Sequence, residues 1–154
     1  SLSLGKSFVN IEEELHTCKA YLDIMSVRYH DKFEYSITCD RNIMQFKCPK
    51  LILLPLVENS IYHGIKGLKY KGNINITVNQ DEDNILFKVS DNGFGIDMDN
   101  LNHILEDETD NNHHFALKHI NRILKLYYGN DYKLDFENQT PGCSISFKIK
   151  KEFL

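Results

Sequence analysis

The sequence has no run of apolar residues near the roughly 18–20 that a membrane-spanning helix needs, so no membrane span is predicted. It has no excess of basic residues either, since 18 lysines and arginines stand against 22 acidic residues and give a formal charge of −4. A nucleic-acid partner is therefore not expected. No signal peptide opens the chain, and it begins with Ser1 instead of methionine, so we expect it to be part of a longer protein.

Cysteine is too scarce and too scattered to form a disulfide framework. The four cysteines include no C-x-x-C pair; they are Cys18, Cys39, Cys48 and Cys143. A chain of 154 residues, 42% hydrophobic and 26% charged, can bury a core without covalent staples. We expect a globular chain with reduced, mostly structural thiols, as in a reducing compartment.

The first predicted element is a helix with a narrow apolar seam. Asn10 can cap its N-terminus, and Glu13 occupies the capping-box position. The seam alternates gaps of four and three residues, and its members are Ile11, Leu15, Cys18, Leu22, Met25 and Tyr29. Two interpretations stay open: the helix packs on its own domain, or it is the end of a dimerising helix that continues upstream.

Alternation of apolar and polar residues predicts five strands, at residues 33–38, 74–78, 85–89, 132–136 and 143–149. Polar turns at residues 81–84 and 140–142 join the last four into two antiparallel hairpins. This pattern predicts an α+β fold of two layers, with the helices on one face of a mostly antiparallel sheet.

Two further helices are predicted between these strands. The first covers residues 51–64, where Pro49 suits the first helical turn and Pro55 must kink or restart the helix. The second begins near Phe115, and Gly129 is its expected C-terminal stop.

Polar side chains interrupt the first of these helices. Asn59 and His63 are four residues apart and share a face, and Glu58 lies about 100° around the helix from Asn59. Buried polar groups are costly without partners. The segment is therefore either a satisfied half-buried edge or the wall of a pocket that holds a cation or a phosphate.

A turn with two glycines follows the strand at residues 85–89. Gly93 and Gly95 permit a tight turn or a close approach of the backbone to a ligand, and Asp91 can accept a hydrogen bond from a ligand amine. No third glycine opens a helix, so the turn is not a dinucleotide fingerprint. The motifs of eukaryotic protein kinases are also missing from the sequence.

Together these motifs resemble a known family. Residues 58–64 resemble the N box, and residues 91–95 the G1 box, of LytS-like sensor histidine kinases. Residues 10–28 and 122–129 resemble the family's helices before the catalytic domain and after the lid. The resemblance implies the Bergerat ATP-binding fold of the GHKL superfamily, a two-layer sandwich of helices and a mixed sheet.

The resemblance also implies roles for single residues. Asn59 would ligate a Mg²⁺ ion that bridges the triphosphate of ATP, and Asp91 would accept from the adenine amino group. Gly93 and Gly95 would let the backbone pass close to the nucleotide, and His63 would lie near the phosphates.

Glu58 would be the acid beside the metal ligand; whether it polarises the attacking group or only orients Mg²⁺ stays open. The implied reaction is transfer of the γ-phosphoryl group of ATP to a histidine upstream of this chain, by positioning and charge neutralisation.

This sequence does not match the family's third box, G-x-G-L. The corresponding residues run from His114 to Leu117, so His114 and Ala116 replace both glycines. Ala116 and Leu117 would still contact the nucleotide. Residues 97–110 hold six acids and no lysine or arginine, a poor lining for a triphosphate unless Mg²⁺ compensates or the lid faces solvent. The alternative function is therefore a non-catalytic signalling or relay domain of the same fold, with weak or no ATP binding.

Three lid histidines, His113, His114 and His119, invite a metal site. Their spacing is not that of a zincin helix, and no nearby cysteine completes a zinc pattern, so we do not expect one. Another ATPase of the superfamily is also disfavoured, because Pro55 stands where those enzymes place a catalytic acid.

The resemblance finally implies an organisation and partners. Residues 1–30 would be the C-terminal part of a dimerisation or linker helix, and residues 31–154 the ATP-binding catalytic domain. The partners would be the upstream phosphoacceptor helix, a cognate response regulator and a second copy in a homodimer. The domain would be cytoplasmic, in a parent protein anchored in the membrane. No histidine of this chain fits the phosphoacceptor motif, so we expect no autophosphorylation of the chain alone.

Overall fold

The computed structural model describes residues 7–106 and 115–154. Its main element is a five-stranded sheet in the order β2 (Phe33–Cys39), β4 (Gly72–Gln80), β5 (Asn84–Asp91), β7 (Cys143–Lys150) and β6 (Asp135–Asn138). Strands β2 and β4 run parallel, and the other neighbouring pairs are antiparallel.

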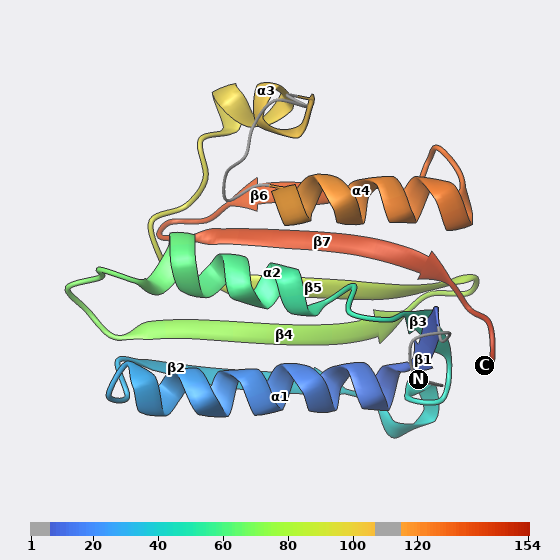
Figure 1. Cartoon of the computed structure of the whole chain (residues 1–154), viewed down its shortest axis with the longest axis horizontal. Coiled ribbons are helices and arrows are strands. Elements are labelled where there is room, and N and C mark those ends of the chain that lie inside the picture. The colour runs from blue at the N-terminus through green and yellow to red at the C-terminus, as the bar shows by residue number, and fades with distance from the viewer. Residues whose placement is uncertain (1–6, 107–114) are drawn as a thin grey trace.

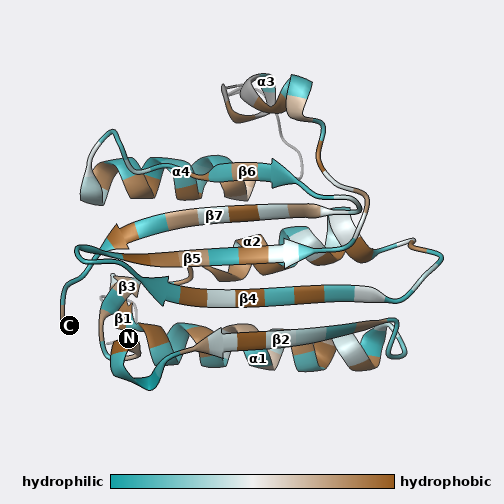
Figure 2. Cartoon of the chain, turned by 180° about the vertical axis from the view of Figure 1, so that it is seen from behind, coloured by the Kyte–Doolittle hydropathy of each residue, from teal (hydrophilic) through white to brown (hydrophobic). Residues whose placement is uncertain are grey.

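Three helices lie on one side of this sheet (Figure 1): α1 (Ile11–Arg28), α2 (Leu54–Asn59) and α4 (Phe115–Tyr128). Figure 2 shows the other side, where none of the described helices covers the strands. The two layers and the mostly antiparallel sheet confirm the predicted α+β fold.

The predicted alternation places one face of each strand in the core. Ile76 of β4 is opposite Val89 of β5, which in turn is opposite Ile145 of β7, and all three are buried. Successive residues of a strand point to opposite faces, so this apolar row faces the helices. Figure 2 shows the alternating hydropathy along β4 and β5.

Helix α1 packs on the chain's own core. The Asn10 side chain caps it by accepting a hydrogen bond from the Glu13 N–H at 2.8 Å, as predicted. The seam residues Ile11, Leu15 and Leu22 are buried in the common core cluster. The chain's own core therefore fills the seam, which is the first of the two interpretations. The division of the chain after residue 30 stays a prediction.

The segment before α2 differs from the prediction. Pro49 does not open a helix: it ends β3 (Lys47–Pro49), which pairs with β1 (Phe8–Asn10) in a small second sheet that was not predicted. The helix begins at Leu54, with Pro55 in its first turn, where a missing N–H costs no hydrogen bond. Pro55 therefore lies in the first turn of a new helix and does not kink an existing helix.

A π-helical segment, η3 (Ser60–Ile65), continues α2 directly. Such wide turns are rare and are frequent at functional sites. The predicted helix over residues 51–64 is therefore an α-helical part followed by a π-helical part, and the N-box segment spans both.

The later elements agree with the sequence prediction, with one shift and one addition. The shift is in β6, which covers Asp135–Asn138 and not the predicted residues 132–136. Helix α4 ends at Tyr128, and Gly129 adopts a positive φ of 112° while its N–H bonds to the Lys125 carbonyl at 2.9 Å. The addition is α3 (Leu101–Glu106), which stands apart from the sheet (Figure 1). The predicted lid histidines His113 and His114 lie outside the described residues.

The predictions about the cysteines and about membrane-spanning segments can be compared with the structure. All four cysteines are described, and each is free. Among the described helices, none combines the length and apolar character needed to cross a membrane.

Candidate functional site

Two adjoining cavities bring the predicted site residues together. The larger, about 200 Å³, is lined by Asn59, His63, Gly64, Asp91, Gly95, Ile96, Asp97 and Cys143. The smaller, about 90 Å³, is lined by Pro55, Glu58, Asn59, Tyr62, His63, Ala116 and Leu117. Asn59 and His63 line both cavities. The site therefore extends from the end of β5, past the N-box segment, to the first turn of α4.

Asp91 is a buried carboxylate that lines the larger cavity. Its side chain is only 6% exposed, and its carboxylate accepts hydrogen bonds from the Gly93 N–H at 2.9 Å and from the Ser60 side chain. Burial raises the pKa of Asp91 above its ordinary value, and the bonds from Gly93, Ser60 and Cys143 oppose that shift. The group is a buried acceptor at the position where the sequence analysis expected one.

Gly93 is needed for packing between the two motifs. A Cβ on Gly93 would lie 1.9 Å from the Gly64 carbonyl oxygen, and a Cβ on Gly64 would lie 2.7 Å from Asp91 Oδ2. The Phe94 N–H also donates to the Gly64 carbonyl at 3.2 Å. The N-box segment and the glycine turn therefore touch backbone to backbone, at the left end of the sheet in Figure 1.

Gly95 lines the larger cavity and has a left-handed backbone conformation. Its φ is +81°, a region that residues with a Cβ rarely adopt. The next residue, Ile96, is fixed by Asn138: the side-chain oxygen accepts from the Ile96 N–H at 2.9 Å, and the side-chain nitrogen donates to the Ile96 carbonyl at 2.7 Å. This pair of bonds fixes the wall of the cavity that faces the N-box segment.

Asn59 presents an unsatisfied oxygen to the site. Its Oδ1 atom is buried, and no described residue donates a hydrogen bond to it. A buried acceptor without a partner costs about 1–3 kcal/mol, so such an atom points to a missing ligand. An amide oxygen is a hard donor of the kind that Mg²⁺ accepts.

Glu58 and His63 lie next to Asn59, and both are half-buried. Within the described ranges, no three His, Cys, Asp or Glu residues gather where a metal could be held by protein alone. Asn59 therefore fits a metal that takes most of its ligands from water and phosphate, as Mg²⁺ usually does.

Two residues that lie against Asp91 were missed by the sequence analysis. Gly142 has a φ of +111°, and a Cβ there would lie 1.9 Å from the Asp91 carbonyl oxygen. Cys143 is opposite Asp91 in the β5–β7 register, and burial raises the pKa of its thiol to about 11. Only strand pairing reveals these two positions.

Lys118 was also not predicted to have a role, and it lines neither of the two cavities. It follows Ala116 and Leu117 in the first turn of α4, is 5% exposed, and its Nζ atom has no hydrogen-bond partner in the described part of the chain. A buried ammonium without a partner is as costly as an unpaired carboxylate. The sequence places this lysine directly after the altered third box, but the sequence prediction gave it no role.

Comparison with known proteins gives this site a context. The sequence profile of the family described as histidine kinase-, DNA gyrase B-, and HSP90-like ATPase matches residues 48–152. The sensor protein LytS of Oceanobacillus iheyensis is 31% identical over 147 residues, covering 93% of this chain and 25% of LytS. The sensor histidine kinase YpdA of Escherichia coli K12 is 32% identical over 146 residues, covering 94% and 25%. The chain thus spans about a quarter of the length of these relatives.

Solved structures show the same fold. The catalytic domain of the histidine kinase ThkA matches with a TM-score of 0.74 at 18% identity, covering 96% of this chain and 97% of that domain. The structure of ThkA in complex with the response regulator protein TrrA matches with a TM-score of 0.69 at 17% identity, covering 94% and 41%.

Proposed function

Because the chain belongs to the family of histidine kinase-, DNA gyrase B- and HSP90-like ATPases, we propose that it is the ATP-binding catalytic domain of a sensor histidine kinase. It would transfer the γ-phosphoryl group of ATP to a histidine nitrogen in an upstream helix of the parent protein. The observation that carries this proposal is the buried, unpartnered Oδ1 atom of Asn59 at the junction of the two cavities.

The larger cavity would hold the adenine. Asp91 is a buried acceptor there, suited to the exocyclic amino group of adenine. A purine with a carbonyl at that position would place an oxygen against a carboxylate, which is repulsive in a desolvated site. The domain should therefore prefer ATP over GTP. Gly95 would let the backbone approach the nucleotide, and Gly93 would keep the turn against Gly64.

The smaller cavity would hold the phosphates. Asn59 would ligate a Mg²⁺ ion, which when bound neutralises charge on the phosphate oxygens. His63 and Leu117 would border the phosphates. Lys118 does not line the cavity, but it follows Leu117 in the first turn of α4, from where its ammonium would add positive charge. This ammonium would help to offset the acidic residues at 97–110, in addition to the Mg²⁺ ion and the solvent-facing lid that the sequence analysis considered.

Glu58 would act beside the metal ligand in one of two ways. Its carboxylate lines the smaller cavity, where it would accept a proton from the attacking imidazole or orient the water ligands of Mg²⁺. Glu58→Gln in the parent protein, which would carry the phosphoacceptor helix, separates the two: loss of autophosphorylation with unchanged ATP affinity supports proton transfer, whereas loss of Mg²⁺-dependent affinity supports the orienting role.

The remaining partners follow from the proposed reaction. A histidine kinase needs a phosphoacceptor helix, a second copy and a response regulator. The relatives are named sensor proteins, and ThkA has been solved with a response regulator. We infer the same partners here, in a cytoplasmic domain of a membrane-anchored parent.

Calorimetric titration with ATP and Mg²⁺ tests the proposal. Asn59→Ala and Asp91→Asn should each weaken binding by roughly tenfold or more, since each removes a buried polar contact. Asn79→Ala and Asp135→Asn, at exposed positions, should leave it unchanged. No binding by the unaltered chain up to millimolar ATP would refute the enzyme, and binding insensitive to Asp91→Asn would refute the assigned residues.

A non-catalytic relay domain is the second candidate, because Ala116 lines the smaller cavity at a position where the family has glycine. The double variant His114→Gly, Ala116→Gly distinguishes the two. If third-box side chains obstruct the site, ATP affinity rises; if the natural chain already binds ATP well and glycine adds nothing, the relay function loses its support.

A further inference from the structure

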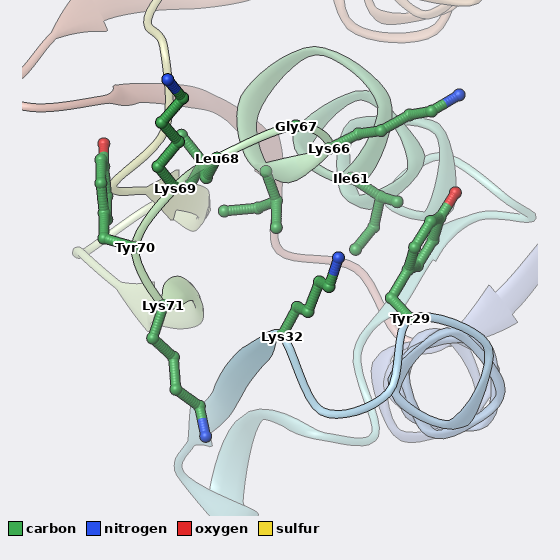
Figure 3. A pocket seen from close by; sticks show the side chains of 10 residues that line it. Tyr29, Lys32, Ile61, Lys66, Gly67, Leu68, Lys69, Tyr70 and Lys71 are labelled. Atoms are coloured by element: carbon green, nitrogen blue, oxygen red, sulfur yellow. The ribbon is translucent and has the colours of Figure 1, made fainter.

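A separate cavity of about 390 Å³ lies between the end of α1, the start of β2 and the loop that follows η3 (Figure 3). It shares no lining residue with the two cavities of the candidate nucleotide site. The volume falls in the range of about 300–1,000 Å³ that is usual for small-molecule sites.

The lining combines an apolar floor with a basic rim. Ile61 and Ile65, which are 1% and 6% exposed, form the floor, and half-buried Leu68 and Tyr29 stand beside it. Among the described residues, no acid lines the cavity, whereas four lysines do: Lys32, Lys66, Lys69 and Lys71.

The four lysines are not equivalent. Lys71 pairs with Glu34 at 3.4 Å, and Lys66 lies over the Tyr62 ring at 5.7 Å. Figure 3 shows the ammonium groups of Lys66, Lys69 and Lys71 pointing away from the cavity, whereas the Lys32 side chain points into it, toward Tyr29 and Ile61. In residues 7–106 and 115–154, neither Lys32 nor Lys69 has an ion-pair partner.

We propose that this cavity is a second binding site, for a small aromatic anion. The apolar ring system would cover Ile61 and Ile65 beside the Tyr29 ring. Its carboxylate, sulfonate or phosphate group would pair with Lys32 inside the cavity, and the exposed Lys69 side chain at the rim would turn toward it. The apolar floor selects against small inorganic anions, and the absence of lining acids selects against cations.

The cavity is also connected to the nucleotide site, a consequence that rests on the proposed function. Ile61 and Ile65 belong to the same π-helical segment as His63. The Tyr70 hydroxyl donates to the Asn92 carbonyl at 2.6 Å, one residue after Asp91. A ligand that shifts this segment or Tyr70 would change ATP affinity, and ATP would change the ligand's affinity by the same factor.

The probe for this site is 8-anilinonaphthalene-1-sulfonate, an aromatic anion that fluoresces when bound, added to the full chain. The double variant Lys32→Gln, Lys69→Gln should weaken its binding by roughly three- to tenfold, because two exposed charge pairs are lost. The matched control, Lys125→Gln with Lys133→Gln, removes the same charge elsewhere on exposed positions and should not change it. The uncharged analogue N-phenyl-1-naphthylamine should bind more weakly, and sulfate alone should not compete at equal concentration.

Amide chemical shifts locate the bound probe. Shifts that saturate around Lys32 and Leu68–Lys71 support the site, whereas shifts confined to Asp91–Gly95, or equal affinities of the two double variants, overturn it. If the probe binds in this cavity without changing ATP affinity, only the proposed connection to the nucleotide site is wrong. Loss of ATP binding alone, with probe binding intact, counts against the proposed function and leaves this site standing.

Discussion

Asp91 combines two properties at the scale of a single residue. Burial raises its pKa, which favours the protonated carboxyl, while its proposed role requires the ionised form as a hydrogen-bond acceptor. Residues in this position are poised to respond to pH, and their titration can be followed separately from the rest of the chain.

Adenosine binding should therefore weaken as the pH falls. The raised pKa means that Asp91 takes up its proton above 3.8, the ordinary value for aspartate, and the neutral carboxyl accepts less strongly from the adenine amino group. Adenosine is the suitable ligand because it carries no phosphate that titrates. Its dissociation constant, measured from amide shifts between pH 7 and pH 4, should rise through the pKa of Asp91. A constant affinity over this range would contradict the role.

A second prediction about a single residue concerns Lys118. Lys118→Met keeps the apolar stem and removes a buried charge, so ATP affinity should fall by roughly tenfold or more while adenosine affinity is unchanged. Calorimetry with both ligands measures the difference. Lys125→Met, at an exposed position of α4, is the control. Equal losses for ATP and adenosine would show that Lys118 only supports the fold.

At the scale of elements, Glu14 joins α1 to the segment before α2. It is buried, and its carboxylate accepts hydrogen bonds from the Leu51 and Leu53 N–H groups, each at 2.9 Å. These two donors stand just before the helix that carries Asn59. Burial is the main cause that raises the pKa of Glu14, and the backbone bonds oppose it. The carboxylate therefore positions the start of α2 from a helix that precedes it by about 40 residues.

Glu14→Ala should lower the free energy of unfolding by about 2 kcal/mol at pH 7, because two N–H groups lose their acceptor. Urea unfolding measures this, with exposed Glu13→Ala as the control, expected to cost under about 1 kcal/mol. The sign with pH follows from the raised pKa: the stabilisation by the bound proton is complete below 4.5 and is lost as the pH rises through the folded-state pKa. A wild-type chain whose Glu14 titrates at or below 4.5 would contradict this.

The elements that the sequence predicted well are those with strong local periodicity. The alternation from Ile74 to Val89 was enough to place β4, β5 and their turn. Pro49 was misassigned because its strand pairs with residues about 40 positions earlier, and no local pattern records such a pairing. The π-helical turn was missed because its apolar spacing over Ile61 and Ile65 also suits an ordinary α-helix.

At the scale of the whole molecule, the site is an assembly of segments that are distant in the chain. The sequence predicted the chemical types at Asn59, His63 and Asp91, and the fold brings these residues to one cavity. It did not predict the contact of Gly64 with Gly93, or Gly142 against the Asp91 backbone, because both depend on the packing of separate elements. The motifs therefore predicted the chemical groups of the site, but not the packing contacts that hold them in place.

We propose above all that Asn59 holds the metal of a nucleotide site, and the Mg²⁺ dependence of ATP affinity tests this role. ATP is titrated into the natural chain and into Asn59→Ala, with Mg²⁺ and then with a chelator in its place. Mg²⁺ should tighten binding to the natural chain by roughly tenfold or more and should have little effect on Asn59→Ala. An equal Mg²⁺ effect on both proteins, or no ATP binding by the natural chain, would contradict it.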